Sequence, residues 1–342
     1  MKQKEKETLN ELQVEAVTSD FLTPLLVVAG PGTGKTKVLV ERIKHMIKNG
    51  TKPSEILCLT FSDKAALEML ERLEKEFDVS EMKIRTFHSF AYEVLDENIL
   101  ESGIGISGGV MSRSNELIWA LNNVDKFDFK HIELGNDPYK ILDAMINGID
   151  TFKNELISPE ELKKFVENKL KDEELQNNPE KLSEIYQLDD FHKLYSHLQK
   201  FLKENRLVDL DDMVMHAVQL LKEKKIVLTK YQKQFKYVLV DEFQDTNYAQ
   251  LELAKLLTPT SHITAVGDED QSIYRFQGAY SSIFDDFRKH YKNPKEIILT
   301  ENYRSTKNII NLASNLLENS VNRTPKKITT ENETGSKTTV AS

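Results

Sequence analysis

A glycine-rich loop between an apolar run and an amphipathic stretch is the feature that most constrains the fold of this 342-residue chain. The sequence LLVVAGPGTGKTKVLVERI spans residues 25–43 and is typical of a strand, a loop and a helix in that order. Backbone N–H groups of such a loop, and the positive end of the helix, point at an anion. The pattern therefore predicts a phosphate-binding loop rather than a chance glycine turn, made of Ala29, Gly30, Pro31, Gly32, Thr33, Gly34, Lys35 and Thr36.

Two side chains of this loop carry the predicted chemistry. Lys35 is expected to reach the β and γ phosphates of a nucleotide, and the Thr36 hydroxyl is expected to bind magnesium. The strict pattern has glycine where this chain has Ala29. Gly30 and Gly32 still supply backbone freedom, and the order of strand, loop and helix is intact.

A second polar feature follows the apolar run in VLVDEFQDTN, residues 238–247. Adjacent carboxylates at the end of a core strand are costly unless a cation pairs with them. Given the phosphate loop, we expect that cation to be magnesium, held by Asp241 directly or through water. Glu242 is then expected to orient and deprotonate the attacking water. Without the loop, the same residues would be interpreted as a solvated strand end or a helix cap.

The order of apolar runs predicts an α/β fold, a parallel sheet flanked by helices. The composition changes between residues 99 and 211. This stretch has 14 Lys and Arg but 22 Asp and Glu, so most of the net charge of −9 lies there. Ser158, Pro159 and Glu161 form a helix start of the capping-box type in that stretch. We therefore expect an inserted all-helical subdomain. The apolar runs of the predicted sheet are PLLVVAG, EILCLTFS, KYVLVDEF, HITAVGD and EIILTEN.

Composition indicates a cytoplasmic protein with no membrane segment. No apolar run approaches the roughly 20 residues of a membrane helix, and the first ten residues are charged where a signal peptide is apolar. The single cysteine, Cys58, excludes an internal disulfide and is expected to fill space in the core.

Eight stretches in a fixed order make the chain resemble the amino-terminal part of UvrD/Rep/PcrA-type superfamily 1 DNA helicases, from about residue 9 to about residue 306. The insert also carries the family-like KNELISPEE. The resemblance implies a RecA-like P-loop NTPase lobe that uses ATP and magnesium and acts on single-stranded DNA. The eight stretches are LNELQVEAV, AGPGTGKT, LTFSDKAALEM, RTFHSFA, DLDDM, VDEFQDTN, VGDEDQSIYRFQGA and LTENYRST.

The resemblance also implies roles at the nucleotide. Gln13 would read the adenine edge and Tyr303 would stack on the ring, although an exposed helix glutamine and a core tyrosine are the ordinary alternatives. Gln271 would contact the γ-phosphate. Arg304 would act as an arginine finger, although a surface arginine is otherwise common.

For DNA, the resemblance implies aromatic stacking and backbone contacts on several loops. From composition alone, Phe61 and Phe276 would be assigned to the core. Two departures weaken the expected DNA contact: Phe276-Gln277 stands where many members have Trp-Arg, and Asp63 stands where asparagine is frequent. The expected DNA-binding residues are Phe61, Lys64, Thr86, His88, Tyr274 and Phe276, with Arg85 as a further candidate for the backbone.

The resemblance divides the chain into four parts. Residues 1–98 and 212–300 would form the ATP-binding lobe, 99–211 the insert, and 301–342 the start of a truncated second lobe. A helix near 305–318 has an apolar stripe that the rest of that lobe would cover, and the last stretch is expected to be mobile or extended.

Three functions remain open at this point. The first, which the resemblance implies, is ATP hydrolysis coupled to 3'-to-5' unwinding, with little turnover expected of this chain alone. The second is a stand-alone ATP-dependent DNA-binding or regulatory module that never translocates. A P-loop kinase or transporter ATPase is disfavoured, because neither explains VGDEDQSIY or TFHSFA.

Overall fold

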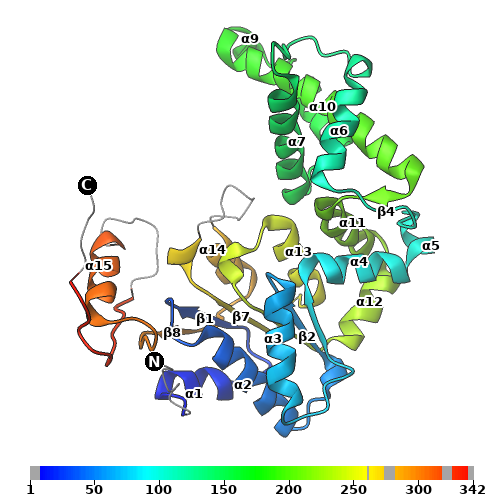
Figure 1. Cartoon of the computed structure of the whole chain (residues 1–342). Coiled ribbons are helices and arrows are strands. Elements are labelled where there is room, and N and C mark those ends of the chain that lie inside the picture. The colour runs from blue at the N-terminus through cyan, green and yellow to red at the C-terminus, as the bar shows by residue number, and fades with distance from the viewer. Residues whose placement is uncertain (1–7, 260–261, 273–281, 318–325, 338–342) are drawn as a thin grey trace. The chain divides into compact units, whose positions relative to one another are not determined.

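The computed structural model describes residues 8–259, 262–272, 282–317 and 326–337. The chain forms two compact units (Figure 1). The first contains Met1–Phe87, Leu228–Asn247 and Ala254–Ser342, and the second contains His88–Val227 and Tyr248–Leu253. Within the described ranges, no helix has the length and apolarity of a membrane span.

The first unit is built on a six-stranded sheet with the order β3-β2-β6-β7-β1-β8. Every pairing in it is parallel, with Val27 opposite Val266 on one side and Ile297 on the other. The predicted parallel sheet flanked by helices is thus confirmed. Its strands are β1 (Leu25–Ala29), β2 (Ile56–Thr60), β3 (Lys83–Thr86), β6 (Tyr237–Val240), β7 (Ile263–Gly267) and β8 (Lys295–Leu299).

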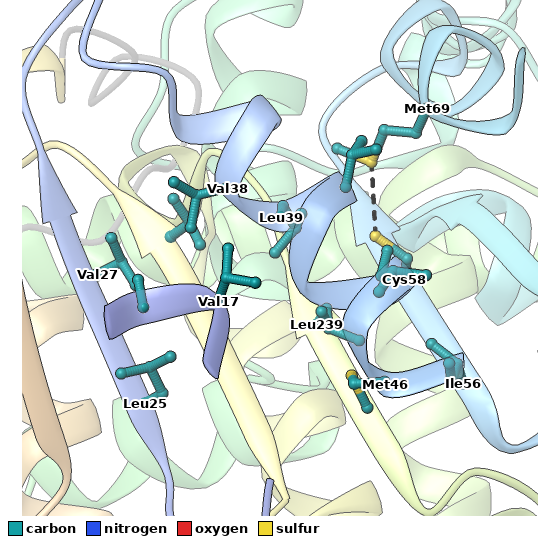
Figure 2. Packing of buried hydrophobic residues seen from close by; sticks show 14 of the residues in the cluster. Val17, Leu25, Val27, Val38, Leu39, Met46, Ile56, Cys58, Met69 and Leu239 are labelled. Carbon is teal, nitrogen blue, oxygen red and sulfur yellow. Dashed lines mark hydrogen bonds between the residues drawn. The ribbon is translucent and has the colours of Figure 1, made fainter. Parts of the chain in front are cut away.

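β1, β2 and β7 are buried on both faces, which explains why their residues are mostly apolar. On one face, Leu25 and Val27 of β1 pack with α1 (Glu11–Thr18) and α2 (Lys35–Lys48), as Figure 2 shows. Cys58 lies in the same core with its Sγ 3.7 Å from the Met69 Sδ of α3 (Asp63–Glu74), and burial raises the pKa of its thiol. The cysteine therefore fills core space, as expected.

The remaining elements of the first unit connect or follow the strands. Phe243, which follows β6, packs edge-on against Phe284 and Phe287 of α14. Ile309, Leu312 and Leu316 of α15 are exposed on the predicted apolar stripe. These elements are η1 (Pro53–Glu55), η3 (Phe243–Asp245), η4 (Glu269–Gln271), α14 (Ile283–His290) and α15 (Lys307–Leu317), while α12 (Lys225–Gln234) and α13 (Tyr248–Leu257) each cross a unit boundary.

The second unit is helical apart from two paired two-residue strands, β4 (Gly109–Val110) and β5 (Leu207–Val208). The expected capping box is present: the Glu161 N–H donates to the Ser158 Oγ, and the Ser158 N–H donates to the Glu161 Oε2. The helices are α4 (Phe87–Glu97), α5 (Ile99–Ser102), α6 (Arg113–Asn122), η2 (Val124–Lys126), α7 (Pro138–Asn154), α8 (Pro159–Lys169), α9 (Glu173–Gln176), α10 (Pro179–Asn205) and α11 (Leu210–Glu223).

A buried ionic cluster joins two parts of the helical unit that are far apart in the sequence. Lys153 of α7 is 0% exposed and contacts Asp209, which caps α11, and Asp212 at 3.0 Å. The Asp212 Oδ1 also accepts a hydrogen bond of 2.6 Å from Gln199 of α10. The stretches KNELISPEE and DLDDM therefore meet in the core of this unit.

Candidate nucleotide-binding site

The glycine-rich loop connects β1 to α2, as its sequence predicts. Gly32 and Gly34 have positive φ angles of 71° and 89°, which other residues rarely adopt. Gly34 is the N-cap of α2 and has no side chain to occupy the free N–H groups of the first turn. Thr33 closes the loop, with its hydroxyl donating to the Gly30 carbonyl at 2.8 Å. Among the described residues no side chain caps the N-terminus of α2, and uncapped N–H groups at a helix N-terminus are the arrangement that binds phosphates.

Neighbouring residues approach this loop so closely that its glycines have no room for a side chain. A Cβ on Gly32 would lie 2.7 Å from the Arg304 Cβ, and one on Gly34 would lie 2.8 Å from the Gln13 Nε2. The Gln13 amide donates to the Thr33 carbonyl at 2.9 Å and accepts from the Asn10 N–H at 3.0 Å. Gln13 is buried and supports the loop in this structure.

Lys35 and the predicted carboxylates, Asp241 and Glu242, lie close together beyond the ends of β1 and β6. The Lys35 Nζ lies 3.3 Å from the Glu242 Oε2. Asp241 is buried, and its Oδ1 has no hydrogen-bond partner among the residues that the structure describes. Burial, with the charge of Glu242 adding to it, raises the pKa of Asp241 to about 7, while Lys35 opposes this shift. A buried, unsatisfied carboxylate oxygen beside a phosphate loop is suited to a cation.

The backbone of Glu242 is unusual, since its φ of 47° is in the left-handed region. That conformation is uncommon for a residue with a Cβ and is seen at functional sites. The Gln244 Nε2 donates to the Glu242 Oε2 at 2.9 Å and to the Asp245 Oδ2 at 3.0 Å. Burial and then the charge of Glu242 raise the pKa of Asp245 to about 6. Gln244 therefore holds two carboxylates in place.

Gln244 also links these carboxylates to the end of β7. Its Oε1 accepts from the Asp268 N–H at 2.8 Å. A Cβ on Gly267 would lie 2.8 Å from the same oxygen, so the close approach requires glycine there. The Asp268 Oδ2 accepts from the Gln271 Nε2 at 2.5 Å. The contacts of Gln244 and Asp268 were not predicted from the sequence, although both residues lie inside the motifs VDEFQDTN and VGDEDQSIYRFQGA.

The stretch after β8 borders the phosphate loop. The Tyr303 N–H donates to the Gly32 carbonyl at 2.9 Å, and the buried Asn302 donates to the Pro31 carbonyl. The Tyr303 hydroxyl donates to the Glu301 Oε2 at 2.8 Å, and burial together with this bond raises its pKa to about 12. Arg304 is exposed beside Gly32. Both residues expected from the resemblance thus adjoin the loop.

The candidate DNA-binding residues are dispersed. Phe61 follows β2 and is exposed, Lys64 is exposed in the first turn of α3, and Thr86 is buried at the end of β3, paired with Thr60. His88 belongs to the helical unit. Tyr274 and Phe276 lie outside the described residues.

The residues present fit a magnesium nucleotide. Gly32 and Gly34 carry no side chains that would fill the loop, and Lys35 is buried beside it. The buried Asp241 Oδ1, which has no hydrogen-bond partner among the described residues, could bind a cation. Among the described residues, no group of three or more His, Cys, Asp or Glu is arranged to hold a metal by itself. Magnesium commonly uses one or two protein ligands and completes its shell with water and phosphate oxygens, so a sparse protein set suits it.

The fold and this site define a phosphate-loop α/β protein. Comparison with known families is more specific: residues 9–292 match the UvrD/REP helicase N-terminal domain. The chain belongs to the UvrD/REP helicase family, which confirms the resemblance drawn from its eight motifs.

Curated relatives agree with this assignment. "ATP-dependent DNA helicase PcrA" of Bacillus subtilis (strain 168) is 38% identical over 335 residues, which are 96% of this chain and 42% of the relative. The protein of the same name from Leuconostoc citreum is 33% identical over 336 residues, covering 97% and 42%. "Probable DNA helicase II homolog" of Mycoplasma capricolum subsp. capricolum is 34% identical over 336 residues, covering 96% and 43%. The chain spans less than half the length of these relatives.

Proposed function

We propose that this chain is the ATP-binding lobe of an ATP-dependent translocase or helicase on single-stranded DNA, working in the cytoplasm with 3'-to-5' polarity. The observation that carries the proposal is the phosphate loop with the Lys35 Nζ 3.3 Å from the Glu242 Oε2, next to the buried Asp241 carboxylate, whose Oδ1 has no hydrogen-bond partner in the described part of the chain. The names of the relatives, ATP-dependent DNA helicases, support the choice of ATP and DNA. The polarity rests on the resemblance to the family.

In this proposal the loop and its helix bind the triphosphate. Backbone N–H groups of Gly32, Gly34, Lys35 and Thr36 surround the phosphates, and the Lys35 side chain neutralises charge at the β and γ positions. Thr36 and Asp241 would hold magnesium, which neutralises phosphate charge when bound. Asp241 suits this role because its free oxygen is buried next to the loop.

The remaining site residues are proposed to activate the attacking water, to stabilise the charge on the leaving phosphoryl group, and to bind adenine. Glu242 accepts the proton of the attacking water, and Gln271 contacts the γ-phosphate. Arg304 stabilises charge as the phosphoryl group leaves. Tyr303 stacks on adenine, and Gln13 reads its edge by exchanging a bond that it now makes within the protein.

Single-stranded DNA would lie across loops at the carboxyl edge of the sheet. Phe61 is exposed there, as a stacking residue must be, and Lys64 is exposed two residues into the next helix. Thr86 at the end of β3 would also contact the DNA. The resemblance assigns DNA contacts to His88, Tyr274 and Phe276 as well. The net charge of −9 favours weak binding, at micromolar Kd or above.

We expect this chain to hydrolyse ATP slowly, with little stimulation by single-stranded DNA. An arginine finger contributes roughly 10³ to 10⁵ in rate, and the family resemblance assigns one arginine to the second lobe. The test compares steady-state hydrolysis, with and without an oligonucleotide, for this chain and for a version carrying the second lobe. DNA stimulation only in the longer version supports the proposal. Vigorous DNA-stimulated turnover by this chain alone would contradict it, and no stimulation in either would favour the binding module.

A further inference from the structure

Residues 326–337 lie beside the stretch that borders the phosphate loop, next to α15 (Figure 1). The Asn302 N–H donates to the Thr329 carbonyl at 2.7 Å, and the Thr329 N–H donates to the Thr300 carbonyl at 2.8 Å. These bonds extend the parallel pairing beyond β8. Ile328 reaches the loop itself, because a Cβ on Gly30 would lie 2.7 Å from its Cδ1.

This placement brings Lys326 into the acidic turn after β7. Its Nζ lies 2.5 Å from the Asp268 Oδ1 and 2.8 Å from the Asp270 Oδ2. The side chains of Lys326 and Asp268 are 2% and 0% exposed. An ionic contact buried to this extent is rare on a surface segment and strongly constrains its partners.

Asp268 connects Lys326 to the catalytic candidates by an unbroken set of contacts. One oxygen of Asp268 accepts from Gln271, and its N–H donates to Gln244. Gln244 in turn donates to Glu242, which contacts Lys35. Lys326 is therefore linked through Asp268 to Gln271 and, through Gln244 and Glu242, to Lys35. Gln271 and Lys35 are the two side chains expected at the γ-phosphate.

We propose that Lys326 is a positioning residue of the nucleotide site, which holds Asp268 so that Gln271 can sense the γ-phosphate. This inference rests on the proposed function, which places Gln271 at that phosphate. Residues 268–270 are all acidic, so a compensating cation also lowers their repulsion of a polyanionic nucleotide. Lys326 acts through Asp268 and does not itself contact the nucleotide.

The test measures calorimetric affinities of this chain for Mg·ATP and Mg·ADP. Replacing Lys326 with Met is expected to lower the affinity for Mg·ATP by about tenfold, the effect of one lost charge-assisted contact, and to affect Mg·ADP much less. Lys326→Arg keeps the charge and is expected to restore most of the preference for ATP. Lys327→Met is the matched control, because Lys327 is adjacent and exposed. Lys326→Gln, neutral but still a donor, is measured as well in case the Met variant does not fold, and its ATP preference is expected to fall in the same direction.

The outcomes separate this inference from the proposed function. If the parent chain prefers ATP and the Met or Gln variant keeps the same ratio of affinities, only the role of Lys326 is overturned. An equal loss of affinity for Mg·ATP and Mg·ADP would mean that Lys326 has a merely structural role, and would also overturn the inference. A parent chain that binds Mg·ATP and Mg·ADP equally well would overturn it too. If the parent binds neither nucleotide, the proposed function itself is wrong.

Discussion

Replacing Glu242 with Gln is expected to slow ATP hydrolysis by about 10²- to 10⁴-fold, the usual contribution of a general base. Affinity for Mg·ATP should change little, since the amide keeps the size of the side chain and Glu242 is proposed to act on the attacking water rather than to contact the nucleotide. Glu242 is suited to the role by its place: it is half-buried, its Oε2 lies 3.3 Å from the Lys35 Nζ, and Gln244 fixes the same oxygen. Single-turnover hydrolysis with radiolabelled ATP is sensitive enough for a slow enzyme.

Asp245→Asn is the matched control for Glu242→Gln. Asp245 accepts from the same Gln244 amide as Glu242, and burial and then the charge of Glu242 raise the pKa of Asp245 to about 6. We expect its loss to slow hydrolysis far less. Equal rates in parent and Glu242→Gln, or a larger effect of Asp245→Asn, would show that Glu242 is not the base.

Replacing Lys153 with Met is expected to lower the free energy of unfolding of the helical unit by about 3–5 kcal/mol. Two carboxylates, Asp209 and Asp212, would remain buried without their cation. Burial, with the charge of Asp212 adding to it, already raises the pKa of Asp209 to about 7, while Lys153 lowers it. An isolated charge in this core is therefore strongly disfavoured.

Urea unfolding followed by circular dichroism tests this prediction. Lys200→Met is the control, since Lys200 lies on α10 of the same unit and is 73% exposed, and a change within about 0.5 kcal/mol is expected. Lys153→Met combined with Asp209→Asn should recover part of the loss. Similar stability of Lys153→Met and Lys200→Met would mean that the cluster does not stabilise this unit.

The sheet was largely predictable because its central strands are buried on both faces. β1 is a continuous apolar run, β2 and β7 are interrupted only by Thr60 and Thr264, and the sequence predicts all three strands. β3 was missed, since only Ile84 in KIRT is a large apolar residue, and this strand exists through its pairing with β2. The order of the strands depends on contacts between distant segments, which no local pattern encodes. The division of the chain at residues 98, 211 and 300 remains a prediction.

The site was predictable as far as its parts carry a local signature. A loop between strand and helix, and carboxylates at a strand end, can be recognised from adjacent residues. Contacts between segments that are distant in the sequence cannot be recognised in this way. Gln244 contacts Asp268, and Asp268 contacts Lys326, only after the chain has folded. Lys326 lies in a polar stretch with nothing to distinguish it from Lys327. Its place depends on the pairing of Thr329 with the stretch after β8.

The central claim is that this chain binds Mg·ATP at residues 29–36, and calorimetric titration of Mg·ATP into the parent chain and into Lys35→Ala tests it most directly. The parent is expected to bind one nucleotide. The variant should lose roughly tenfold to hundredfold in affinity, since it lacks the cation that faces the phosphates. Lys48→Ala, at the other end of α2 and 59% exposed, should bind as the parent does. Equal affinity of parent and Lys35→Ala, or no binding by the parent, would contradict the claim.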